Sequence, residues 1–437
     1  MVELPQIAGD EADSHFVANY PPFSVWRPEH LPAAIEALDS EPRPDVPLGL
    51  YLHIPFCRKR CRFCYYRVYT DRNAADVEVY LDALAREVAM YADRPALRGR
   101  QFEFVYFGGG TPSFLSSKQL RRLIDRINRT WTWDAAREVT FECEPGTLRK
   151  SKLEAIRAIG VTRLSLGVEH FDDAILEVNG RAHKSPEIFR AYGWAREVGF
   201  PQINLDLIAG MVGETDDKWA RTVEESLALE PDSVTIYQME LPHNSVLSRE
   251  CRASGTAPPI ADWATKRRWV DEAFRRFEAA GYVVSSAYTL VKSSIDSDFV
   301  YRDALWHGAD LIGTGVASFS HFAGVHFQNV DGWEDYVQSC RAGRLPLHRA
   351  LPITPRQALI RELSLQLKTG RLDAGYFRHK FGAEIRREFA EVFESLTAEA
   401  HAVIDGDEIR LTRPGLLQAD ALLTRFFENA HRNIRYT

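Results

Sequence analysis

The sequence predicts an α/β fold built around a partial TIM-type β/α barrel. Short apolar segments alternate with amphipathic segments of helical periodicity about six times between residues 49 and 280. Such alternation is typical of parallel strands joined by crossover helices. A hydrophobic content of 45% and a charged content of 26% over 437 residues allow a large core and argue against disorder. We expect about six strand–helix units, an N-terminal arm and a small C-terminal helical domain.

Each unit of the barrel has its own pattern. Strands are expected over 49–54, 102–107, 138–142, 162–169, 202–210 and 232–240. Helices are expected over 80–91, 120–127, 152–159, 172–178, 186–198, 216–229 and 262–280. Ser116 or Ser117 is placed to cap the second helix, and Gly160 is placed just after the third, where glycine commonly ends a helix.

The two ends of the chain differ from the barrel pattern. Residues 1–47 are rich in Pro and aromatic side chains, with a short helical pattern near 33–38, and we interpret them as an arm. Residues 48–350 are assigned to the barrel and its extension. Residues 351–437 are assigned to a helical domain with one short hairpin at the Asp405-Gly406 turn signal.

Composition narrows the class of partner. The net charge of −7 is spread along the chain, which gives no footprint for nucleic acid. We find neither a signal-peptide pattern nor an apolar run of the roughly 18 residues that a membrane span needs. Sparse cysteine fits a reducing cytoplasm, so we expect a cytoplasmic protein. We also expect a small-molecule substrate as its partner, and a monomer.

Three of the six cysteines, Cys57, Cys61 and Cys64, fall within eight residues, whereas Cys143, Cys251 and Cys340 are isolated. A structural zinc site needs four ligands, and no second Cys/His pair has suitable spacing. A dithiol made of Cys61 and Cys64 leaves Cys57 unexplained. Three thiolates can instead hold a [4Fe-4S] cluster and leave one iron open for a small chelating molecule. We therefore predict Cys57, Cys61 and Cys64 as cluster ligands.

The C-x3-C-x2-C spacing, with aromatic Phe63 before the last cysteine, closely resembles the signature of the radical S-adenosylmethionine (SAM) superfamily. That resemblance implies that the open iron holds SAM, and that reductive cleavage of SAM gives a 5′-deoxyadenosyl radical. It also implies an electron donor such as flavodoxin or ferredoxin. The glycines of Gly108–Thr111 follow a strand, where they let the backbone approach a ligand closely.

The segments YLHIPFC, YFGGGTPS, RLSLGVEHFDD, NLDLIAG and LIGTGVASFS occur in the order seen in the HemN-like (oxygen-independent coproporphyrinogen III oxidase-like) family. This resemblance covers nearly the whole chain. It implies a first SAM site and, with apolar residues, a second SAM position beside it. At the first SAM site the resemblance implies Tyr51, Gly109, Gly110, Thr111, Glu142, Glu169, Arg181 and Asp206. At the second SAM position it implies Phe63, Ile208 and Met239. It also implies a cofactor contact for Ala317 in the last motif.

Three departures from the family pattern bear on the reaction. Glu169 replaces a glutamine, Tyr66 replaces a further cysteine, and Glu240 places a carboxylate after the sixth strand. A carboxylate at that point suits a neutral or cationic substrate better than a tetra-anionic porphyrinogen. We therefore expect Glu169 and Glu240 to be catalytic side chains. Tyr51, which the resemblance implies at the first SAM, is the third catalytic side chain that we expect.

Our first hypothesis for the activity is class C methyl transfer or cyclopropanation, in which two SAM molecules deliver a methyl or methylene group to an sp2 carbon. The alternative is oxidative decarboxylation of coproporphyrinogen III propionates to vinyl groups, with Arg27, Arg67 and Arg302 as candidate propionate partners. A further alternative is a heme-binding or heme-trafficking protein, with His53, His170 or His307 as the candidate ligand.

Overall fold

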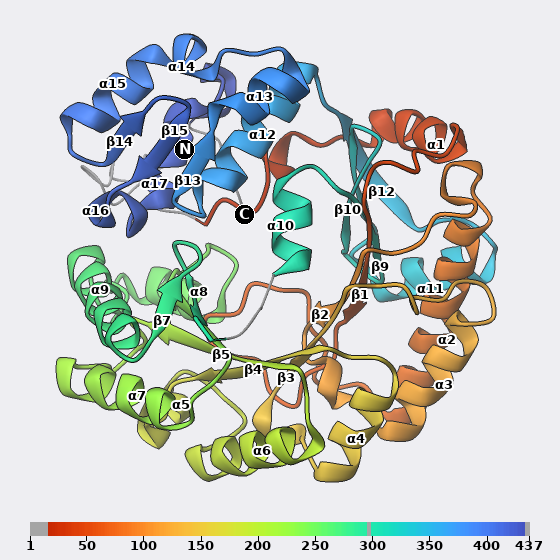
Figure 1. Ribbon diagram of the computed structural model, residues 1–437. Coiled ribbons are helices and arrows are strands. Elements are labelled where there is room, and N and C mark those ends of the chain that lie inside the picture. The colour runs from red at the N-terminus through yellow and green to blue at the C-terminus, as the bar shows by residue number, and fades with distance from the viewer. Residues whose placement is uncertain (1–15, 295–298, 433–437) are drawn as a thin grey trace.

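A curved sheet forms the inner wall of the molecule, and helices cover its outer face (Figure 1). The structure is a computed structural model that describes residues 16–294 and 299–432. The first 15 residues of the expected arm and the last five of the expected C-terminal domain lie outside the described residues. In Figure 1 the strands and their helices form an arc, and the C-terminal module closes the gap between the two ends of that arc.

The sheet confirms the partial barrel. Its central strands run in parallel in the order β1-β2-β3-β4-β5-β6, and the twelve-stranded sheet extends beyond both ends as β12-β11-β10-β9 and β8-β7. The six central strands are β1 (Leu48–Ile54), β2 (Phe104–Gly109), β3 (Glu138–Cys143), β4 (Arg163–Glu169), β5 (Gln202–Ala209) and β6 (Ser233–Gln238). Because all six are parallel, their carboxyl ends meet at one rim of the sheet, where such folds place their sites.

The crossover helices follow the expected amphipathic segments. They are α2 (Ala74–Ala92), α3 (Ser117–Ile127), α4 (Lys150–Ala158), α5 (Asp173–Val178), α6 (Ser185–Val198), α7 (Asp216–Ala228) and α9 (Trp263–Ala279). Ser116 accepts a hydrogen bond from the backbone N–H of Gln119 and caps α3, as its position before the apolar pattern predicts. No helix within the described ranges is both long and apolar enough to cross a membrane.

The sequence did not indicate several elements between β6 and the C-terminal module. These are α8 (Val246–Ser254), β7 (Tyr282–Val284), β8 (Thr289–Lys292), α10 (Val300–Trp306), β9 (Asp310–Thr314), β10 (Phe319–Phe322), β11 (Val325–Asn329), α11 (Trp333–Arg341) and β12 (Leu347–Pro352). β9 pairs in parallel with β1, whereas β10, β11 and β12 add antiparallel strands beyond it.

The C-terminal module is less purely helical than the sequence predicts. It contains α12 (Pro355–Leu367), α13 (Ala374–Phe381), α14 (Ile385–Glu388), α15 (Ala390–Ala398), α16 (Arg413–Leu416) and α17 (Ala419–Leu423). The expected hairpin is present as β14 (Ala402–Asp405) and β15 (Glu408–Leu411), but β13 (Arg371–Asp373) joins it and makes a three-stranded sheet. A three-residue strand is too short to show a period in the sequence, which explains why β13 was missed.

The described part of the N-terminal segment packs against two different cores. Val17 and Tyr20 belong to the hydrophobic core of the C-terminal module. Helix α1 (Leu31–Asp39) places Ala34 and Leu38 in the core of the barrel. The segment therefore connects both ends of the molecule, while the expected division at residues 47 and 350 stays a prediction.

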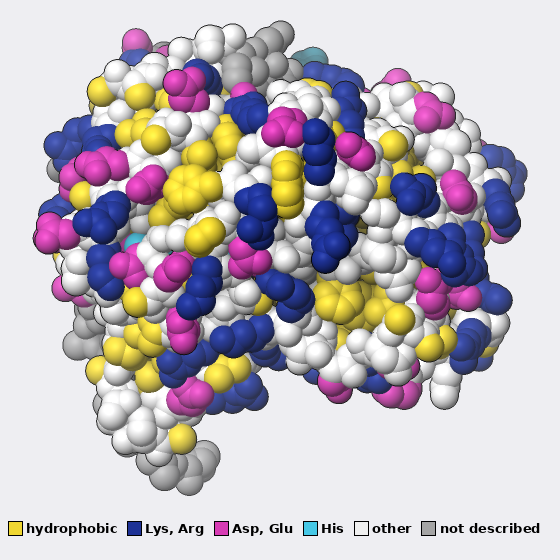
Figure 2. Space-filling view, turned by 90° about the horizontal axis from the view of Figure 1, so that it is seen from below, with side chains coloured by type: hydrophobic (Ala, Val, Ile, Leu, Met, Phe, Trp, Pro, Cys, Tyr) yellow, Lys and Arg dark blue, Asp and Glu magenta, His cyan; other side chains and the backbone are white. Residues whose placement is uncertain are grey.

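Charged side chains on the face shown in Figure 2 are mixed in sign, with Lys and Arg interspersed among Asp and Glu.

Candidate functional site

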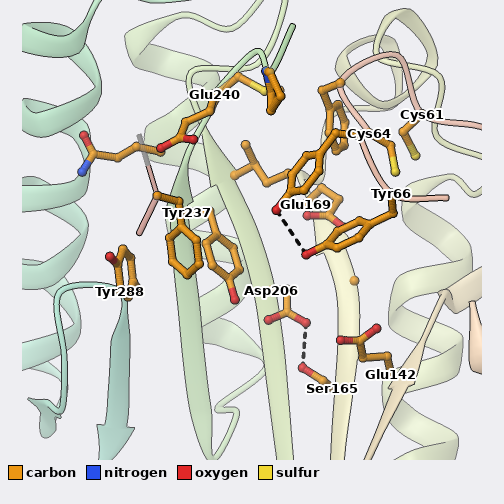
Figure 3. A pocket seen from close by; sticks show the side chains of 18 of the residues that line it. Cys61, Cys64, Tyr66, Glu142, Ser165, Glu169, Asp206, Tyr237, Glu240 and Tyr288 are labelled. Atoms are coloured by element: carbon orange, nitrogen blue, oxygen red, sulfur yellow. Dashed lines mark hydrogen bonds between the residues drawn. The ribbon is translucent and has the colours of Figure 1, made fainter. Parts of the chain in front are cut away.

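A cavity of about 400 Å³ lies at the carboxyl ends of the barrel strands (Figure 3). One side of it is formed by the loop that carries Cys57, Cys61 and Cys64 (the cysteine loop) and by the turn of residues 109–111 at the end of β2 (the glycine turn). The ends of β5 and β6, the start of β8 and residues 416–420 of the C-terminal module form the other. The cavity therefore lies between the barrel and the C-terminal module, and Phe16 of the N-terminal segment also lines it.

Cys57, Cys61 and Cys64 line the same side of this cavity, and none is in a disulfide. The Cys57 Sγ lies 3.3 Å from the Thr111 hydroxyl oxygen, and the Arg181 guanidinium donates to the Cys61 Sγ at 3.3 Å. Burial raises the pKa of Cys57 to about 11, so this thiol needs a cationic or metal partner to ionise.

The arrangement of the thiols tests whether they suit a cluster. In the described ranges, no three His, Cys, Asp or Glu side chains are arranged to hold a single metal ion. Three thiols around one end of a cavity suit a cluster with several irons.

The glycine turn approaches the cysteine loop so closely that side chains are excluded. Gly109 has a φ of +115°, and a Cβ atom there would lie 2.6 Å from the His53 ring. A Cβ atom on Gly110 would meet the backbone of Pro55 and Phe56 at about 3 Å. The Gly109 N–H donates to the Glu142 carboxylate at 3.3 Å. Glycine is thus required here for close packing, and the turn borders the cavity beside the thiols.

Arg181 connects the cysteine loop to the end of β4. Its guanidinium lies 3.3 Å from the Glu169 carboxylate and donates to the Gly167 carbonyl at 2.7 Å. Glu169 has a φ of +63°, which is uncommon for a residue other than glycine and costs of order 1–3 kcal/mol. The surrounding structure holds this conformation, and the Glu169 side chain lines the cavity.

Two half-buried carboxyl groups, Glu142 on β3 and Asp206 on β5, lie deeper in the cavity. Burial raises the pKa of Glu142 to about 7, although the Tyr106 hydroxyl donates to it at 2.7 Å. Burial also raises the pKa of Asp206 to about 7, although Ser165 donates to it at 2.6 Å. Both groups line the cavity in Figure 3 and can exchange a proton near neutral pH.

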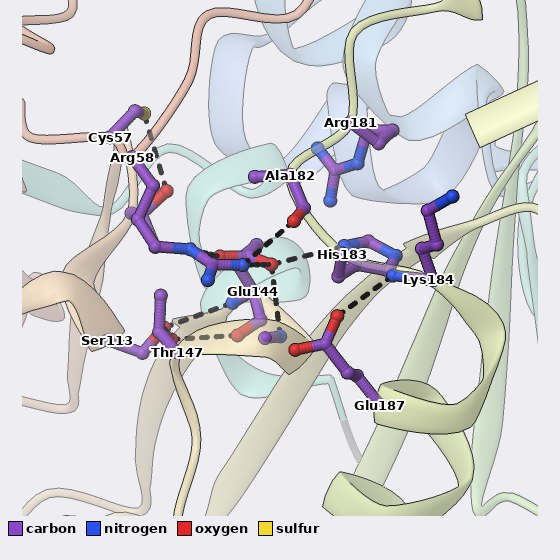
Figure 4. A network of polar contacts seen from close by, with 12 residues as sticks. Cys57, Arg58, Ser113, Glu144, Thr147, Arg181, Ala182, His183, Lys184 and Glu187 are labelled. Atoms are coloured by element: carbon purple, nitrogen blue, oxygen red, sulfur yellow. Dashed lines mark hydrogen bonds and ion pairs between the residues drawn. The ribbon is translucent and has the colours of Figure 1, made fainter. Parts of the chain in front are cut away.

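A polar network behind the cysteine loop links it to the loop that carries Arg181 (Figure 4). Arg58 donates two hydrogen bonds of 3.0 Å to the Glu144 carboxylate and one of 3.1 Å to the Ala182 carbonyl. The His183 Nδ1 lies 3.2 Å from the same carboxylate. Burial opposes ionisation of Glu144, but hydrogen bonds from His183 and Arg58 outweigh it and lower its pKa to about 2. Glu144 is therefore an ionised anchor between two loops of the site.

The far side of the cavity is aromatic and acidic. Tyr237 and Tyr288 lie there with Glu240, opposite Cys61 and Cys64 (Figure 3). The Tyr288 hydroxyl donates to the Asp420 carboxylate, which also forms an ion pair of 2.9 Å with buried Lys368. The C-terminal module thus contributes polar side chains to the site, a role that the sequence pattern did not reveal.

Most of the residues that the sequence singled out meet at this cavity. Its lining includes the three cysteines together with Phe63, Gly109, Gly110, Thr111, Glu142, Glu169, Arg181, Asp206, Ile208, Met239 and Glu240. Phe63, Ile208 and Met239 also pack in one small apolar cluster, so a core role and a cofactor-lining role are compatible.

Tyr51 and Ala317 are not among the described residues that line the cavity. Tyr51 lies one layer behind, where its ring stacks on that of Tyr106 with centroids 5.9 Å apart. Ala317 lies in the turn after β9, where its backbone N–H donates to the Val330 carbonyl. The direct roles expected for these two residues remain predictions.

The candidate heme ligands and propionate partners also lie elsewhere. His53 packs against Gly109, His170 lies 3.1 Å from the buried Glu214 carboxylate, and His307 bonds to the Asp303 carbonyl. Arg67 pairs with Asp331, and Arg302 pairs with Asp303. Arg27 donates to the backbone carbonyls of Ser24 and Trp26. None of these six side chains is among the described residues that line the cavity.

The side chains that sequence reasoning missed are Glu144, Tyr237, Tyr288, Lys368 and Asp420. Glu144 follows directly after Glu142 and Cys143 in a strand-end position, so its placement could have been noticed. The others come from late strands or from the C-terminal module, and no motif in the sequence marks them.

Comparisons with known proteins agree with this geometry. Residues 51–225 match the radical SAM superfamily. The chain is 28% identical over 389 residues to the oxygen-independent coproporphyrinogen III oxidase of Escherichia coli, covering 86% of this chain and 84% of the oxidase. It is 26% identical over 379 residues to the heme chaperone HemW of Bacillus subtilis, covering 86% of this chain and 98% of HemW.

A solved structure extends the comparison to nearly the full length. The coproporphyrinogen III oxidase HemN from Escherichia coli, a radical SAM enzyme, superposes with a TM-score of 0.82 at 25% identity. The match covers 94% of this chain and 96% of that one, so it includes the C-terminal module as well as the barrel.

Proposed function

We propose that this chain, which is a radical SAM protein of the HemN-like family, oxidatively decarboxylates the propionate side chains of a porphyrinogen. The carrying observation is that the similarity to coproporphyrinogen III oxidase HemN covers 94% of this chain, which is far more than the barrel alone. The 94% is large enough to include most of the C-terminal module, whose residues 416–420 line the cavity opposite the cysteines.

The cofactors of this family are a [4Fe-4S] cluster and SAM, and the residues present fit them. Three free thiols at one end of the cavity would hold the cluster. The backbone at Gly109 and Gly110, which lines the cavity beside the thiols, and the Arg181 guanidinium would hold the amino-acid part of SAM. When bound, these cofactors supply a 5′-deoxyadenosyl radical that takes a hydrogen atom from the substrate.

The overall reaction balances with one further partner. Each propionate, –CH2–CH2–COO⁻, loses one hydrogen atom, one electron and CO2, and becomes a vinyl group. The hydrogen atom goes to the radical, and the electron goes to a one-electron acceptor. The chain's own residues hold the reactants, with the cysteine loop on one side of the cavity and residues 416–420 of the C-terminal module on the other.

Methyl or methylene transfer to an sp2 carbon is the second candidate. The far side of the cavity has Asp206, Glu240 and Asp420 among its lining residues, and this acidity favours a neutral or cationic substrate over one with four carboxylates. The comparisons nevertheless favour the oxidase over this reaction, which was our first hypothesis, because relatives that match over 86–90% of this chain include oxidases and HemW.

An anaerobic assay tests the proposal. The reconstituted protein is incubated with coproporphyrinogen III, methyl-labelled SAM and a reductant such as reduced flavodoxin. Release of CO2 with 5′-deoxyadenosine, without transfer of label to the tetrapyrrole, supports the oxidase. S-adenosylhomocysteine with label in the product would support methyl transfer.

Free cysteines, with no disulfide in the described ranges, fit the cytoplasmic location that we propose.

A further inference from the structure

The cavity divides into two halves of different charge. The lining Lys and Arg side chains, Arg58, Lys59, Arg60 and Arg181, all lie on the side of the cysteine loop. The half formed by residues 206–288 and 416–420 contains carboxyl and aromatic side chains, and none of its described lining residues is Lys or Arg. A propionate carboxylate placed in that half would meet other carboxyl groups. This half of the cavity therefore suits a different kind of ligand group.

Glu240 and Gln238 are hydrogen-bond acceptors in this acidic half. Glu240 follows the end of β6 and accepts a hydrogen bond from the Phe16 backbone N–H. The Gln238 amide donates from Nε2 to the Leu417 carbonyl at 2.9 Å, which fixes the orientation of the amide. Its Oε1 atom is buried and has no hydrogen-bond partner among the described residues. A buried acceptor without a partner is costly. Because this atom has almost no exposed surface, the Gln238 side chain, which lines the cavity, must turn slightly toward it before a ligand donor can relieve that cost.

We propose that Glu240 and the Gln238 carbonyl oxygen form an acceptor site for the pyrrole N–H groups of the substrate. This inference rests on the proposed function. A porphyrinogen carries four pyrrole N–H groups, which are donors only, on a flexible apolar macrocycle. Acceptors beside Tyr237 and Tyr288 match both properties, since aromatic rings cover the apolar carbons while the acceptors take the N–H groups.

The division of charge then gives the orientation of the substrate. The macrocycle lies toward β6 and the C-terminal module, and the propionate carboxylates point to the basic half beside the cysteine loop. The acidic lining, which otherwise disfavours a tetra-anionic substrate, acts as the site for its N–H donors. Specificity follows, because a tetrapyrrole whose nitrogens carry no hydrogen leaves these acceptors unpaired.

Anaerobic binding measurements test this site. Tryptophan fluorescence quenching gives the affinity of the full chain, carrying its cluster, for coproporphyrinogen III and for zinc coproporphyrin III. Both ligands have four propionates, but the zinc complex has no N–H group. We expect Glu240→Leu to weaken coproporphyrinogen binding about tenfold or more, as for loss of a hydrogen bond to a charged group. Binding of the zinc complex should change less than about twofold.

Two further variants act as controls. Glu240→Gln keeps a carbonyl acceptor and should retain coproporphyrinogen binding within about threefold. Glu391→Gln changes an exposed carboxylate on α15 and should have no effect. Gln238→Leu, which keeps the side-chain size, should also weaken coproporphyrinogen binding. Thermal unfolding curves that match wild type establish that each variant is folded.

The outcomes separate this inference from the proposed function. If Glu240→Leu and Gln238→Leu bind coproporphyrinogen like wild type while turnover to vinyl groups persists, the acceptor site is wrong and the oxidase stands. If both variants weaken binding but wild type releases no CO2, the acceptor site stands and the oxidase is wrong. If wild type binds no coproporphyrinogen, both are wrong.

Discussion

Cys57, Cys61 and Cys64 lie in one loop at the cavity, whereas Cys143, Cys251 and Cys340 are buried in other parts of the fold. Cys143, the last residue of β3, also lines the cavity, but only the first three thiols lie together in one loop. We therefore expect Cys57→Ala, Cys61→Ala and Cys64→Ala each to abolish a stable [4Fe-4S] cluster. Iron and sulfide content per chain, together with the visible absorbance, measure this after anaerobic reconstitution.

The isolated cysteines provide matched controls. Cys143→Ala, Cys251→Ala and Cys340→Ala should keep full iron and sulfide content, because none of them lies in the cysteine loop. A full cluster in any variant of the first set would contradict the ligand assignment.

Glu240 gives the substrate affinity a defined pH dependence. Burial, with a contribution from the Asp420 charge, raises the pKa of Glu240 to about 8. A pyrrole N–H binds the ionised carboxylate better than the neutral acid, so affinity should rise as the pH increases through 8. Because the neutral acid keeps a carbonyl acceptor, as Glu240→Gln does, the gain between pH 7 and pH 9 should be about two- to threefold.

Several other charged or ionisable groups face Glu240. They are Tyr65, Lys266, Tyr288, Lys368 and Asp420. The Glu240→Gln variant identifies the responsible group, because it removes the titration of residue 240 and leaves the others. A rise in affinity that persists in Glu240→Gln would assign the pH dependence to another group.

Among the elements, the six barrel units could be predicted because each pairs an apolar strand with an amphipathic helix long enough to show its period. The three-residue strands β7 and β13 could not, because they are too short to show a period. In addition, β13 pairs with β15, which is distant in the sequence. The cluster loop, the glycine turn and Arg181 were found through their motifs. Asp420 and Tyr288 were missed because only the tertiary fold brings them to the cavity.

The link between two loops of the site can be tested through Glu144. Glu144→Ala leaves Arg58 and buried His183 without their shared carboxylate. We expect it to lower the free energy of unfolding by about 1–3 kcal/mol and to speed the loss of iron to a chelator, while iron content at the start is normal. The rate of chelator colour formation and urea unfolding curves measure the two effects.

The matched control is Glu197→Ala, which breaks the exposed ion pair with Lys150. Since exposed pairs contribute about 0–1 kcal/mol, this variant should release iron at the wild-type rate. Equal rates for Glu144→Ala and wild type would show that Glu144 does not hold the cysteine loop in place.

Across the whole molecule, buried Lys368 joins the two ends of the chain. Its ammonium pairs with Asp420 at 2.9 Å and donates to the Val17 carbonyl. Burial lowers the pKa of Lys368, and the Asp420 carboxylate opposes that shift. Lys368→Met should lower the free energy of unfolding by about 3 kcal/mol, because removing one partner leaves the other charge buried and unpaired. Urea unfolding measures this change.

A comparison with an exposed pair shows whether burial is the reason. Lys292→Met breaks the ion pair with Glu230 at the surface, and we expect a change below about 1 kcal/mol. The double variant Lys368→Met/Asp420→Asn should be less destabilised than the sum of the two single variants, because the pair is coupled. Additive effects would contradict a direct interaction.

The central claim is that this chain uses radical SAM chemistry to convert porphyrinogen propionates to vinyl groups. The most direct measurement is the anaerobic ratio of CO2, 5′-deoxyadenosine and new vinyl groups formed from coproporphyrinogen III. We predict equal amounts of all three for wild type and none for Cys61→Ala. Formation of 5′-deoxyadenosine without CO2, or of a tetrapyrrole that carries label from the SAM methyl group, would contradict the claim.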